Sequence, residues 1–459
     1  MRNSNLRQPA AALLALLAFS PSLRADDLSI LRAQLHQLEQ KILILERKQE
    51  LKDETATATA KAAAKLNASD GRVEIVSGDG ATSLRLRGLV QADYRWYDAA
   101  NDPADTFLLR RARLIFEGKF NNIFSYVLQP ELAGTIQILD ANLNAAISPA
   151  FNVRAGKFKT PVGLEQLQSD PVAFFNERSV ATGLTPNRDL GLAVHGDVLN
   201  KTVNYTVALL NGVADGGNNV TGGADFDSDK TIAARVFATP FANDKDSFLN
   251  GLGVGIAVSA GDYATTSGRG AGYRTDGQQN FFSYDASVVA AGQGLTVSPQ
   301  GYFYRGPFGL LTEYVISSID VQRPTFGVRE VKNHAYNLSA GWVLTGEASS
   351  YRGVTPKTVF NPAAGTWGAF EIVGRIAGVD IDDTVFAGPA ASRLANPNAS
   401  ATKLTTYALG LNWYLSRSVR AGFNLYHNEF DLAPGATPAA GALISDDETT
   451  FISRFQVSF

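Results

Sequence analysis

Apolar and polar residues alternate in short segments from Leu84 to the C-terminus. Between Leu84 and Trp96, every even position is uncharged. The charged residues occupy odd positions: Arg85, Arg87, Asp93 and Arg95. Successive side chains of a β-strand point to opposite faces, so this segment is predicted to be a strand with one apolar wall and one polar wall.

The same alternation recurs often enough to define a fold class. Candidate strands lie at 84–97, 107–120, 123–132, 136–147, 150–159, 190–199, 202–211, 229–239, 251–261, 280–290, 294–305, 308–319, 333–345, 367–379, 402–415, 418–430 and 449–459. Short turns, as at Asn121 and Asn200, are interspersed with long connections rich in Gly, Asp and Asn, as at 212–228 and 380–402. Short turns at one end and long loops at the other are typical of outer-membrane β-barrels.

The number of strands follows from where the turns must lie. A bacterial single-chain barrel has an even number of strands, whereas the candidates number seventeen. One end of the barrel should hold Phe459 together with the short turns at Asn121, Asn200 and Pro307. This is possible only if 280–290 belongs to an outer loop. We therefore expect an all-β, antiparallel, sixteen-stranded transmembrane β-barrel over residues 72–459.

Composition agrees with such a barrel and excludes several other classes. Mean hydropathy is −0.06 and no internal run reaches the ~20 apolar residues of a membrane helix, but a barrel needs apolar residues only at alternate positions. The chain has no cysteine, which excludes disulfides and thiolate chemistry. Its net charge of −3 gives no sign of nucleic-acid binding, and no sequence pattern suggests a cofactor.

The N-terminus has the order of features of an export signal. Arg2 and Arg7 precede an apolar stretch at 10–19 that is too short to span a membrane, and Ala25 lies at the expected cleavage point. We expect residues 1–25 to be a signal peptide, with the protein delivered to the Gram-negative outer membrane. The alternative is a buried N-terminal helix.

Residues 26–52 are predicted to form a coiled-coil helix in the periplasm. The apolar positions are spaced by four and three residues, as in a heptad seam: Leu31, Leu35, Leu38, Ile42 and Leu45. One helix cannot bury this seam alone, so it is expected to pair with other copies; the alternative is a helix lying on the body of its own chain. Residues 53–71, rich in Ala, Thr and Lys, are expected to be a spacer, part helix and part flexible.

The candidate strand at 107–120 indicates which wall faces the lumen. Its sequence FLLRRARLIFEGK places Arg111, Arg113, Glu117 and Lys119 on one face. An Arg or Lys on the lipid side at mid-membrane costs ~2–4 kcal/mol, so the Arg111 face is expected to point inward. Arg110 breaks the alternation, and we expect its long side chain to reach the headgroup region near the long-loop end.

Further cations and one long connection complete the candidate path. Lys157, Lys159 and Arg235 lie on polar strand positions, and 160–189 is a long segment without strand patterning that can fold inward to narrow the pore. Cations that line a constriction concentrate anions, and the planar fork of Arg suits oxyanions. The alternative is a set of lumen ion pairs that only braces the barrel.

The last strand ends in an aromatic residue. Phe451, Phe455, Val457 and Phe459 share one face. A terminal Phe on an alternating last strand resembles the signal that the barrel-assembly machinery reads, so this machinery is an expected partner.

The chain resembles the phosphate-selective porin O/P family. The matching stretches include 107–119 and GAFEIVGR at 368–375, and the others are 87–93, 155–165, 177–179, 186–191 and 306–314. The resemblance implies a homotrimer of sixteen-stranded barrels that takes up phosphate or polyphosphate through a path lined by Arg and Lys, with an inward-folded third loop. Six candidate path residues that fall within these stretches are Arg111, Arg113, Lys157, Lys159, Arg178 and Ser179.

We therefore predict an outer-membrane porin for passive diffusion of small anions. The predicted anion path comprises Arg87, Asp93, Arg95, Arg111, Arg113, Lys157, Lys159, Arg178, Ser179, Arg188 and Arg235. The alternatives are a porin for other substrates, a barrel enzyme and an adhesin. Catalysis would need a Ser, a His and an orienting partner together, whereas the barrel histidines lie on separate strands, so no enzyme is expected: His195, His334 and His427.

Overall fold

The computed structural model describes residues 25–69, 72–219, 228–264, 272–324 and 326–459. The predicted signal peptide falls almost entirely on residues 1–24, which lie outside the described residues. The chain divides into two units, which we describe separately. One contains the N-terminal helix, and the other contains Lys65–Val76 and Gly80–Phe459.

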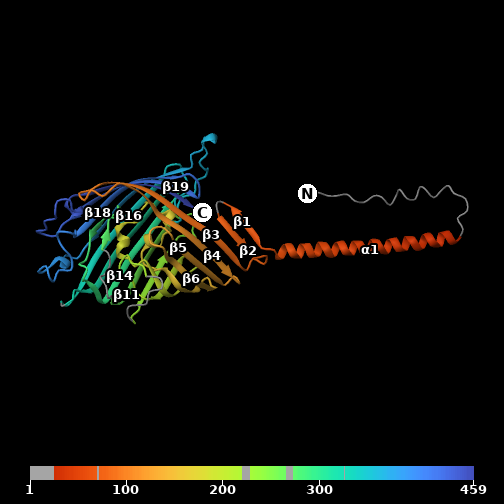
Figure 1. Cartoon of the computed structure of the whole chain (residues 1–459), viewed down its shortest axis with the longest axis horizontal. Helices are drawn as coiled ribbons and strands as arrows, with labels where there is room; N and C mark the ends of the chain where they lie inside the picture. The colour runs from red at the N-terminus through yellow and green to blue at the C-terminus, as the bar shows by residue number, and fades with distance from the viewer. Residues whose placement is uncertain (1–24, 70–71, 220–227, 265–271, 325) are drawn as a thin grey trace. The chain divides into compact units, whose positions relative to one another are not determined.

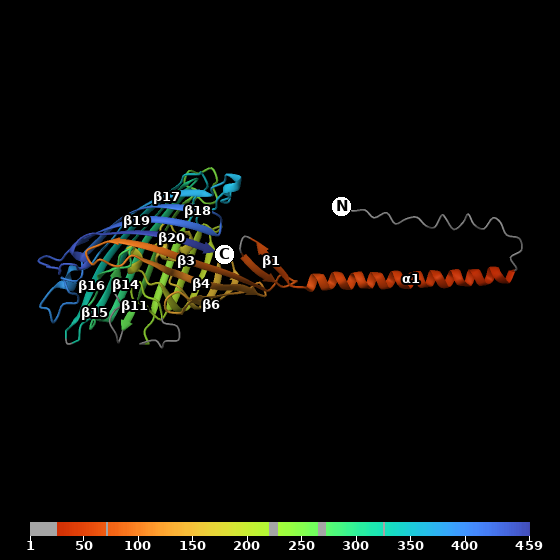
Figure 2. The ribbon, with the colours of Figure 1, turned by 45° about the horizontal axis from the view of Figure 1, so that its top comes forward.

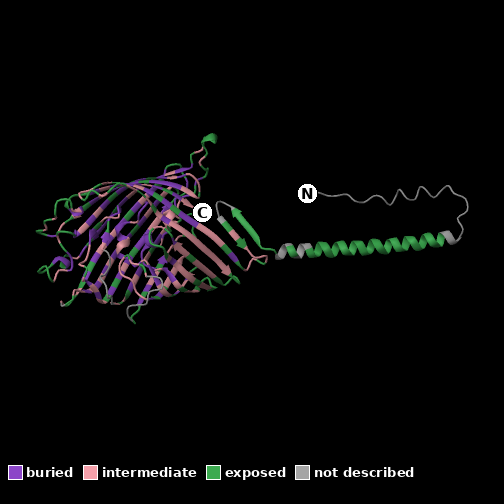
Figure 3. Ribbon diagram, in the orientation of Figure 1, coloured by how far each residue is buried: buried purple, intermediate pink, exposed green. Residues whose placement is uncertain are grey.

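The first unit contains one long helix, α1 (Ala25–Ala62). It continues past residue 52, where the spacer was predicted to begin, because alanine has the highest intrinsic helix propensity and needs no apolar stripe to extend a helix. Its heptad seam is exposed; Leu38, for example, is 61% exposed (Figure 3). No helix among the described residues has the length and apolarity needed to cross a membrane.

A β-hairpin precedes the barrel and was not predicted. Strand β1 (Lys65–Ser69) pairs with β2 (Arg72–Val76), and β2 pairs with the first part of β3 (Ser83–Asp98). The prediction of a spacer up to residue 71 was therefore wrong. Each hairpin strand has only five residues, too few for alternation to stand out in the sequence.

Sixteen antiparallel strands form one closed barrel, as predicted (Figures 1 and 2). After β3 they are β4 (Thr106–Phe120), β5 (Phe124–Glu131), β6 (Gln137–Ser148), β7 (Phe151–Lys159), β8 (Arg188–Val198), β9 (Val203–Leu210), β10 (Thr231–Ala238), β11 (Leu252–Ala264), β14 (Val289–Arg305), β15 (Phe308–Gln322), β16 (Val328–Val343), β17 (Ala369–Asp380), β18 (Lys403–Tyr414), β19 (Val419–Asp431) and β20 (Glu448–Ser458). The barrel closes where β20 pairs with β3. The backbone of Phe459 exchanges hydrogen bonds of 2.8 and 3.0 Å with Gly88.

The candidate strand at 280–290 is not a barrel strand, as the parity argument required. Within it, β13 (Asn280–Phe282) pairs with β12 (Tyr273–Arg274) in a separate two-stranded sheet. Both lie in the connection between β11 and β14. The phenylalanines of β13 are fully buried, so this part of the connection is packed rather than extended into solvent.

Alternating burial along the strands reproduces the two walls read from the sequence (Figure 3). On β18, Thr406 and Asn412 are fully buried on the lumen side, whereas Leu409 on the other side is 58% exposed. An apolar outer wall combined with a polar inner wall is the reverse of a soluble protein. It matches a barrel whose outer surface contacts lipid.

The connections follow the predicted division of lengths with two exceptions. The turns at the Phe459 end are short, except for residues 239–251 between β10 and β11 and residues 344–368 between β16 and β17. The second of these includes a 3₁₀ turn, Pro362–Ala364. At the other end, long connections pack apolar side chains together, among them Phe282, Val385 and Leu443. They include the 3₁₀ turns Asp383–Phe386 and Leu443–Ser445.

The prediction that Arg110 reaches the headgroup region was wrong. Arg111 pairs with Gln91 and Leu109 with Ala92, so Arg110 is the extra residue of a β-bulge. The bulge lets two consecutive arginines both point inward, while Leu109 stays on the outer wall at 52% exposed. The sequence showed the break in alternation at Arg110. It could not show the bulge, because a bulge is defined by the pairing of one strand with its neighbour.

The bulge predicts a difference between two single-residue deletions. Deleting Arg110 removes the extra residue and keeps Leu109 outside, so the barrel should still fold. Deleting Ala112 can be absorbed only by placing an arginine on the lipid wall, at a cost of ~2–4 kcal/mol. Heat-modifiable mobility in gel electrophoresis measures the folded fraction, and an equal loss in both variants would contradict this description of β4.

Candidate functional site

The connection between β7 and β8, residues 160–187, lies inside the barrel and carries the centre of the site. It contains α2 (Leu164–Leu167) and the 3₁₀ turns Asp170–Val172 and Val180–Leu184. We call it the constriction loop. Leu164, Phe175 and Leu184 are almost fully buried and anchor it against the lumen wall. Arg188, which was grouped with this loop in the sequence, is the first residue of β8.

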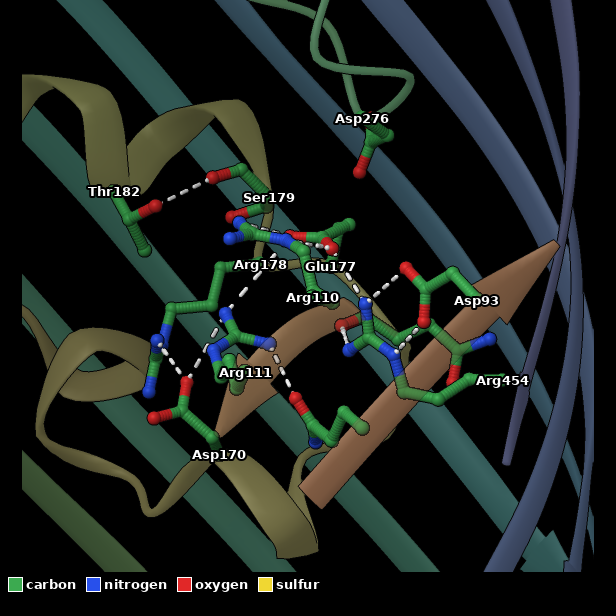
Figure 4. A network of polar contacts seen from close by, with 12 residues as sticks. Asp93, Arg110, Arg111, Asp170, Glu177, Arg178, Ser179, Thr182, Asp276 and Arg454 are labelled. Atoms are coloured by element: carbon green, nitrogen blue, oxygen red, sulfur yellow. Dashed lines mark hydrogen bonds and ion pairs between the residues drawn. The ribbon is translucent and has the colours of Figure 1, made fainter. Parts of the chain in front are cut away.

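Glu177 of the constriction loop binds arginines from three places on the wall (Figure 4). Its carboxylate lies 2.9 Å from Arg95 Nη2, 2.8 Å from Arg110 Nε and 2.6 Å from Arg454 Nη2. Asp93 completes the cluster, at 2.9 Å from Arg95 and 2.6 Å from Arg454. This cluster joins the loop to β3, β4 and β20.

Asp170 forms a second cluster (Figure 4). It lies 3.3 Å from Arg111 Nη2 and 2.6 Å from Arg178 Nη1, and it also pairs with Arg113. Arg113 is shared with Glu131 of β5, at 2.6 Å. The loop is therefore tied to β4 by a second carboxylate.

Glu165 forms the third tie, to the opposite part of the sheet. It accepts a hydrogen bond from Ser179 Oγ at 2.5 Å and pairs with Arg375 Nη2 of β17 at 2.6 Å. Arg375 also pairs with Asp276, from the connection between β11 and β14, at 3.2 Å. The predicted site lacked Glu165, Glu177, Asp276, Arg375 and Arg454, because only the fold brings them together. The lumen-facing position of Arg454 on the last strand was the available signal.

Charge pairing controls the ionisation of the loop carboxylates. Burial acts to raise the pKa of Asp170, but Arg111, Arg178 and Arg113 outweigh it and hold that pKa well below its usual range. In the same way, Arg110, Arg454 and Arg111 outweigh burial at Glu177 and hold its pKa well below the usual range. Both carboxylates stay ionised and neutralise the surrounding arginines.

The other predicted path residues lie outside these clusters. Lys157 is buried and donates to the carbonyl of Asn219 at 2.6 Å. Arg188 pairs with Asp140 at 3.1 Å, Arg235 donates to Gln300 at 2.9 Å, and Arg87 lies 3.4 Å from Glu117. Lys159 Nζ is bound by carbonyl oxygens of the constriction loop.

A cavity of about 1040 Å³ lies between the constriction loop and the short-turn end of the barrel. We call it the vestibule. Residues of the β18–β19 turn and of the connection 344–368 border it, together with the C-terminal Phe459. Its cationic lining residues are Arg87, Arg113, Arg154, Lys159, Arg188, Arg352, Arg417 and Arg420. Its carboxylate side chains are Asp140 and Asp170.

The ion pairs of Glu177 predict a large effect of one neutral substitution. Glu177→Gln removes the carboxylate that pairs with Arg95, Arg454 and the partly buried Arg110, and breaking a buried ion pair costs about 3–5 kcal/mol. We expect a lower thermal unfolding midpoint and a more variable single-channel conductance. Glu74→Gln is the control, because its pair with Arg85 is partly exposed and should contribute about 1 kcal/mol or less. Equal effects of the two substitutions would contradict the bracing role.

Asp276 predicts a dependence on pH near neutrality. Burial raises the pKa of Asp276 to about 7, although Arg375 opposes the shift. Because the folded state then binds a proton more tightly than the unfolded state, this group favours folding at acidic pH, and the contribution is lost as pH rises through about 7. The thermal unfolding midpoint of the wild type, measured relative to that of Asp276→Asn, should therefore decrease as the pH is raised from about 5 to about 8. A constant difference across that range would rule out titration of Asp276.

Comparison with known proteins identifies the family of this chain. Residues 84–459 match the family model described as phosphate-selective porin O and P. Porin O of Pseudomonas aeruginosa is 24% identical over 424 residues, which cover 85% of this chain and 91% of that protein.

Solved structures share the fold at low sequence identity. The anion-selective porin from Comamonas acidovorans has a TM-score of 0.50 and 15% identity, over 82% of this chain and all of that chain. OmpT of Vibrio cholerae has a TM-score of 0.51 and 11% identity, over 86% of this chain and all of that chain. Together with the family match, the sixteen-stranded barrel shows that the chain belongs to the phosphate-selective porin O and P family of outer-membrane porins.

Proposed function

We propose that this protein lets small anions diffuse passively across the outer membrane, with phosphate or polyphosphate as the substrate. The observation that carries the proposal is the cationic lumen: eight arginine and lysine side chains border the vestibule, against two carboxylate side chains. A cationic, water-filled cavity raises the local concentration of anions. The family description names phosphate-selective porins, and the porin from Comamonas acidovorans is anion-selective, which supports the same class of substrate.

Nine of the eleven predicted path residues fall into two groups in this proposal; Lys157 and Arg235 belong to neither group. Those that border the vestibule would contact a passing anion: Arg87, Arg113, Lys159 and Arg188. Arginine can present two parallel N–H donors to an oxyanion, and lysine adds a mobile point charge. Transport requires binding weak enough for release, so partial neutralisation by Asp140 and Asp170 serves passage rather than opposing it.

A bracing role is proposed for the second group, because each of its members belongs to the constriction loop or to the ion-pair clusters that hold this loop. Arg95, Arg111 and Arg178 contact Glu177 or Asp170, and Asp93 holds Arg95 and Arg454. Ser179 is bound to Glu165. These residues would fix the constriction loop and thereby set the width of the pore.

We also propose that the protein assembles as a homotrimer, with α1 in the periplasm as a parallel coiled coil. The support is the exposed seam of α1, whose five heptad residues are each about half exposed or more in the single chain. Phe459 would be read by the barrel-assembly machinery before it takes its place over Gly88, where a Cβ atom would come within 2.2 Å of the Phe459 ring.

Planar-bilayer recordings test the transport proposal. In a KCl gradient, wild-type channels should show a reversal potential of the sign for chloride preference. Orthophosphate should reduce the chloride current at sub-millimolar concentration. Cation preference would overturn the anion proposal, and the absence of block would overturn phosphate as the substrate.

The coiled-coil proposal is tested at the centre of the seam. Leu38→Asp places a charge at a core position and should lower the yield or thermal stability of the trimer. Gln37→Asp changes charge equally at a neighbouring position outside the seam and should have little effect. Cross-linking followed by electrophoresis measures the trimer. Wild-type trimer levels in Leu38→Asp would show that α1 does not hold copies together.

A further inference from the structure

Charged residues flank the apolar seam of α1. The spacing of the seam defines its heptad positions: Leu35 and Ile42 occupy position a, whereas Leu31, Leu38 and Leu45 occupy position d. The residue before each a position is then a g residue, and the residue after each d position is an e residue. In a coiled coil, the e and g residues lie beside the core and contact the neighbouring helix.

Between residues 39 and 53, the g and e residues of α1 carry opposite charges. Lys41 and Lys48 are g residues, whereas Glu39, Glu46 and Asp53 are e residues. All five are exposed in the single chain (Figure 3). This part of the seam therefore has a basic side and an acidic side, and both can be reached by a neighbouring helix.

The spacing of these charges does not suit pairing within one copy. Glu46 lies five residues after Lys41, whereas only residues three or four apart are neighbours on the surface of a helix. Among the described residues, Lys41, Glu46 and Lys48 form no ion pair, although Arg47 pairs with Glu50, three residues further on, at 2.9 Å. The flanking charges thus remain available to another helix.

A spacing of five residues matches the contacts across a parallel coiled coil. There, a g residue faces the e residue of the following heptad on the neighbour, so Lys41 would face Glu46 and Lys48 would face Asp53. In an antiparallel coil, g residues face g residues and e residues face e residues. Between residues 39 and 53 that arrangement would set lysine against lysine and carboxylate against carboxylate, so only the parallel, in-register arrangement pairs opposite charges.

We infer that α1 selects other copies of this chain as its partners, in parallel and in register, through Lys41–Glu46 and Lys48–Asp53 pairs between neighbouring helices. The inference rests on the coiled coil of the proposed function and names the contacts that order it. Chain connectivity agrees, because only two residues separate α1 from β1, and barrels with one orientation in the membrane need helices that run in one direction. A helix with a different charge pattern would meet like charges and be excluded.

Cross-linking of introduced cysteines tests the orientation and the register. The chain has no native cysteine, so only introduced thiols react with a short bismaleimide. Full-length Lys41→Cys and Glu46→Cys chains, folded together in detergent, should give covalent dimers, because position 41 of one copy faces position 46 of the next. Neither variant alone should give them. Dimers from Lys41→Cys alone, or none from the mixture, would overturn the inference.

Charge reversal in the same mixture tests the ion pairs. Lys48→Glu, added to both chains, should lower the yield of covalent dimer in a fixed time at least about twofold, because attraction to Asp53 becomes repulsion. Adding Asp53→Lys should restore the yield. Arg47→Glu is the control, since it makes the same change of charge at an f position outside the seam and should have little effect.

The outcomes separate the charge pairs from the coiled coil itself. No loss from Lys48→Glu, an equal loss from Arg47→Glu, or no recovery with Asp53→Lys would overturn the charge pairing while the coiled coil stands. Wild-type trimer levels in Leu38→Asp would instead overturn the coiled coil of the proposed function. Heat-modifiable mobility confirms for each variant that the barrel has folded.

Discussion

The pairing of three buried loop carboxylates with arginines of the barrel wall is the interaction on which the interior depends. Glu165, Asp170 and Glu177 belong to one connection, and their partners belong to strands on different sides of the lumen. Burial penalises each charge, and only pairing in good geometry offsets that cost. The same contacts therefore hold the constriction loop inside the barrel, keep its carboxylates ionised and neutralise the arginines that face them.

In this arrangement, different residues brace the constriction loop and attract anions, whereas the sequence predicted one set of residues for the anion path. At the constriction, charge is cancelled locally and the residues act as a brace. In the vestibule, Lys159 and Arg420 donate to carbonyl oxygens and Arg154 lies over the ring of Phe158; these neutral contacts position the cations and leave their charge uncancelled. A channel for anions benefits from both, because a rigid narrow section sets the pore size while uncancelled charge attracts the substrate.

Much of the fold could be predicted because its causes are local. Alternation along each strand predicted the apolar and polar walls of the barrel. The requirement that the short turns lie at one end excluded the candidate strand at 280–290 and left sixteen strands. The bulge at Arg110 and the β1–β2 hairpin were missed, since a single strand does not reveal its pairing. The site was predicted only in part: Arg111 and Arg113 followed from the lumen wall, but the contact of Glu177 with Arg454 joins residues far apart in the chain.

The central claim is that uncancelled positive charge, and with it anion binding, lies in the vestibule rather than at the braced constriction. Anomalous diffraction from crystals soaked in tungstate, a tetrahedral oxyanion with a strong anomalous signal, would locate bound anions directly. The account predicts anomalous peaks in the vestibule, beside cations that border it such as Arg154 and Arg420. A peak confined to the arginines around Asp170 and Glu177, with none in the vestibule, would contradict it.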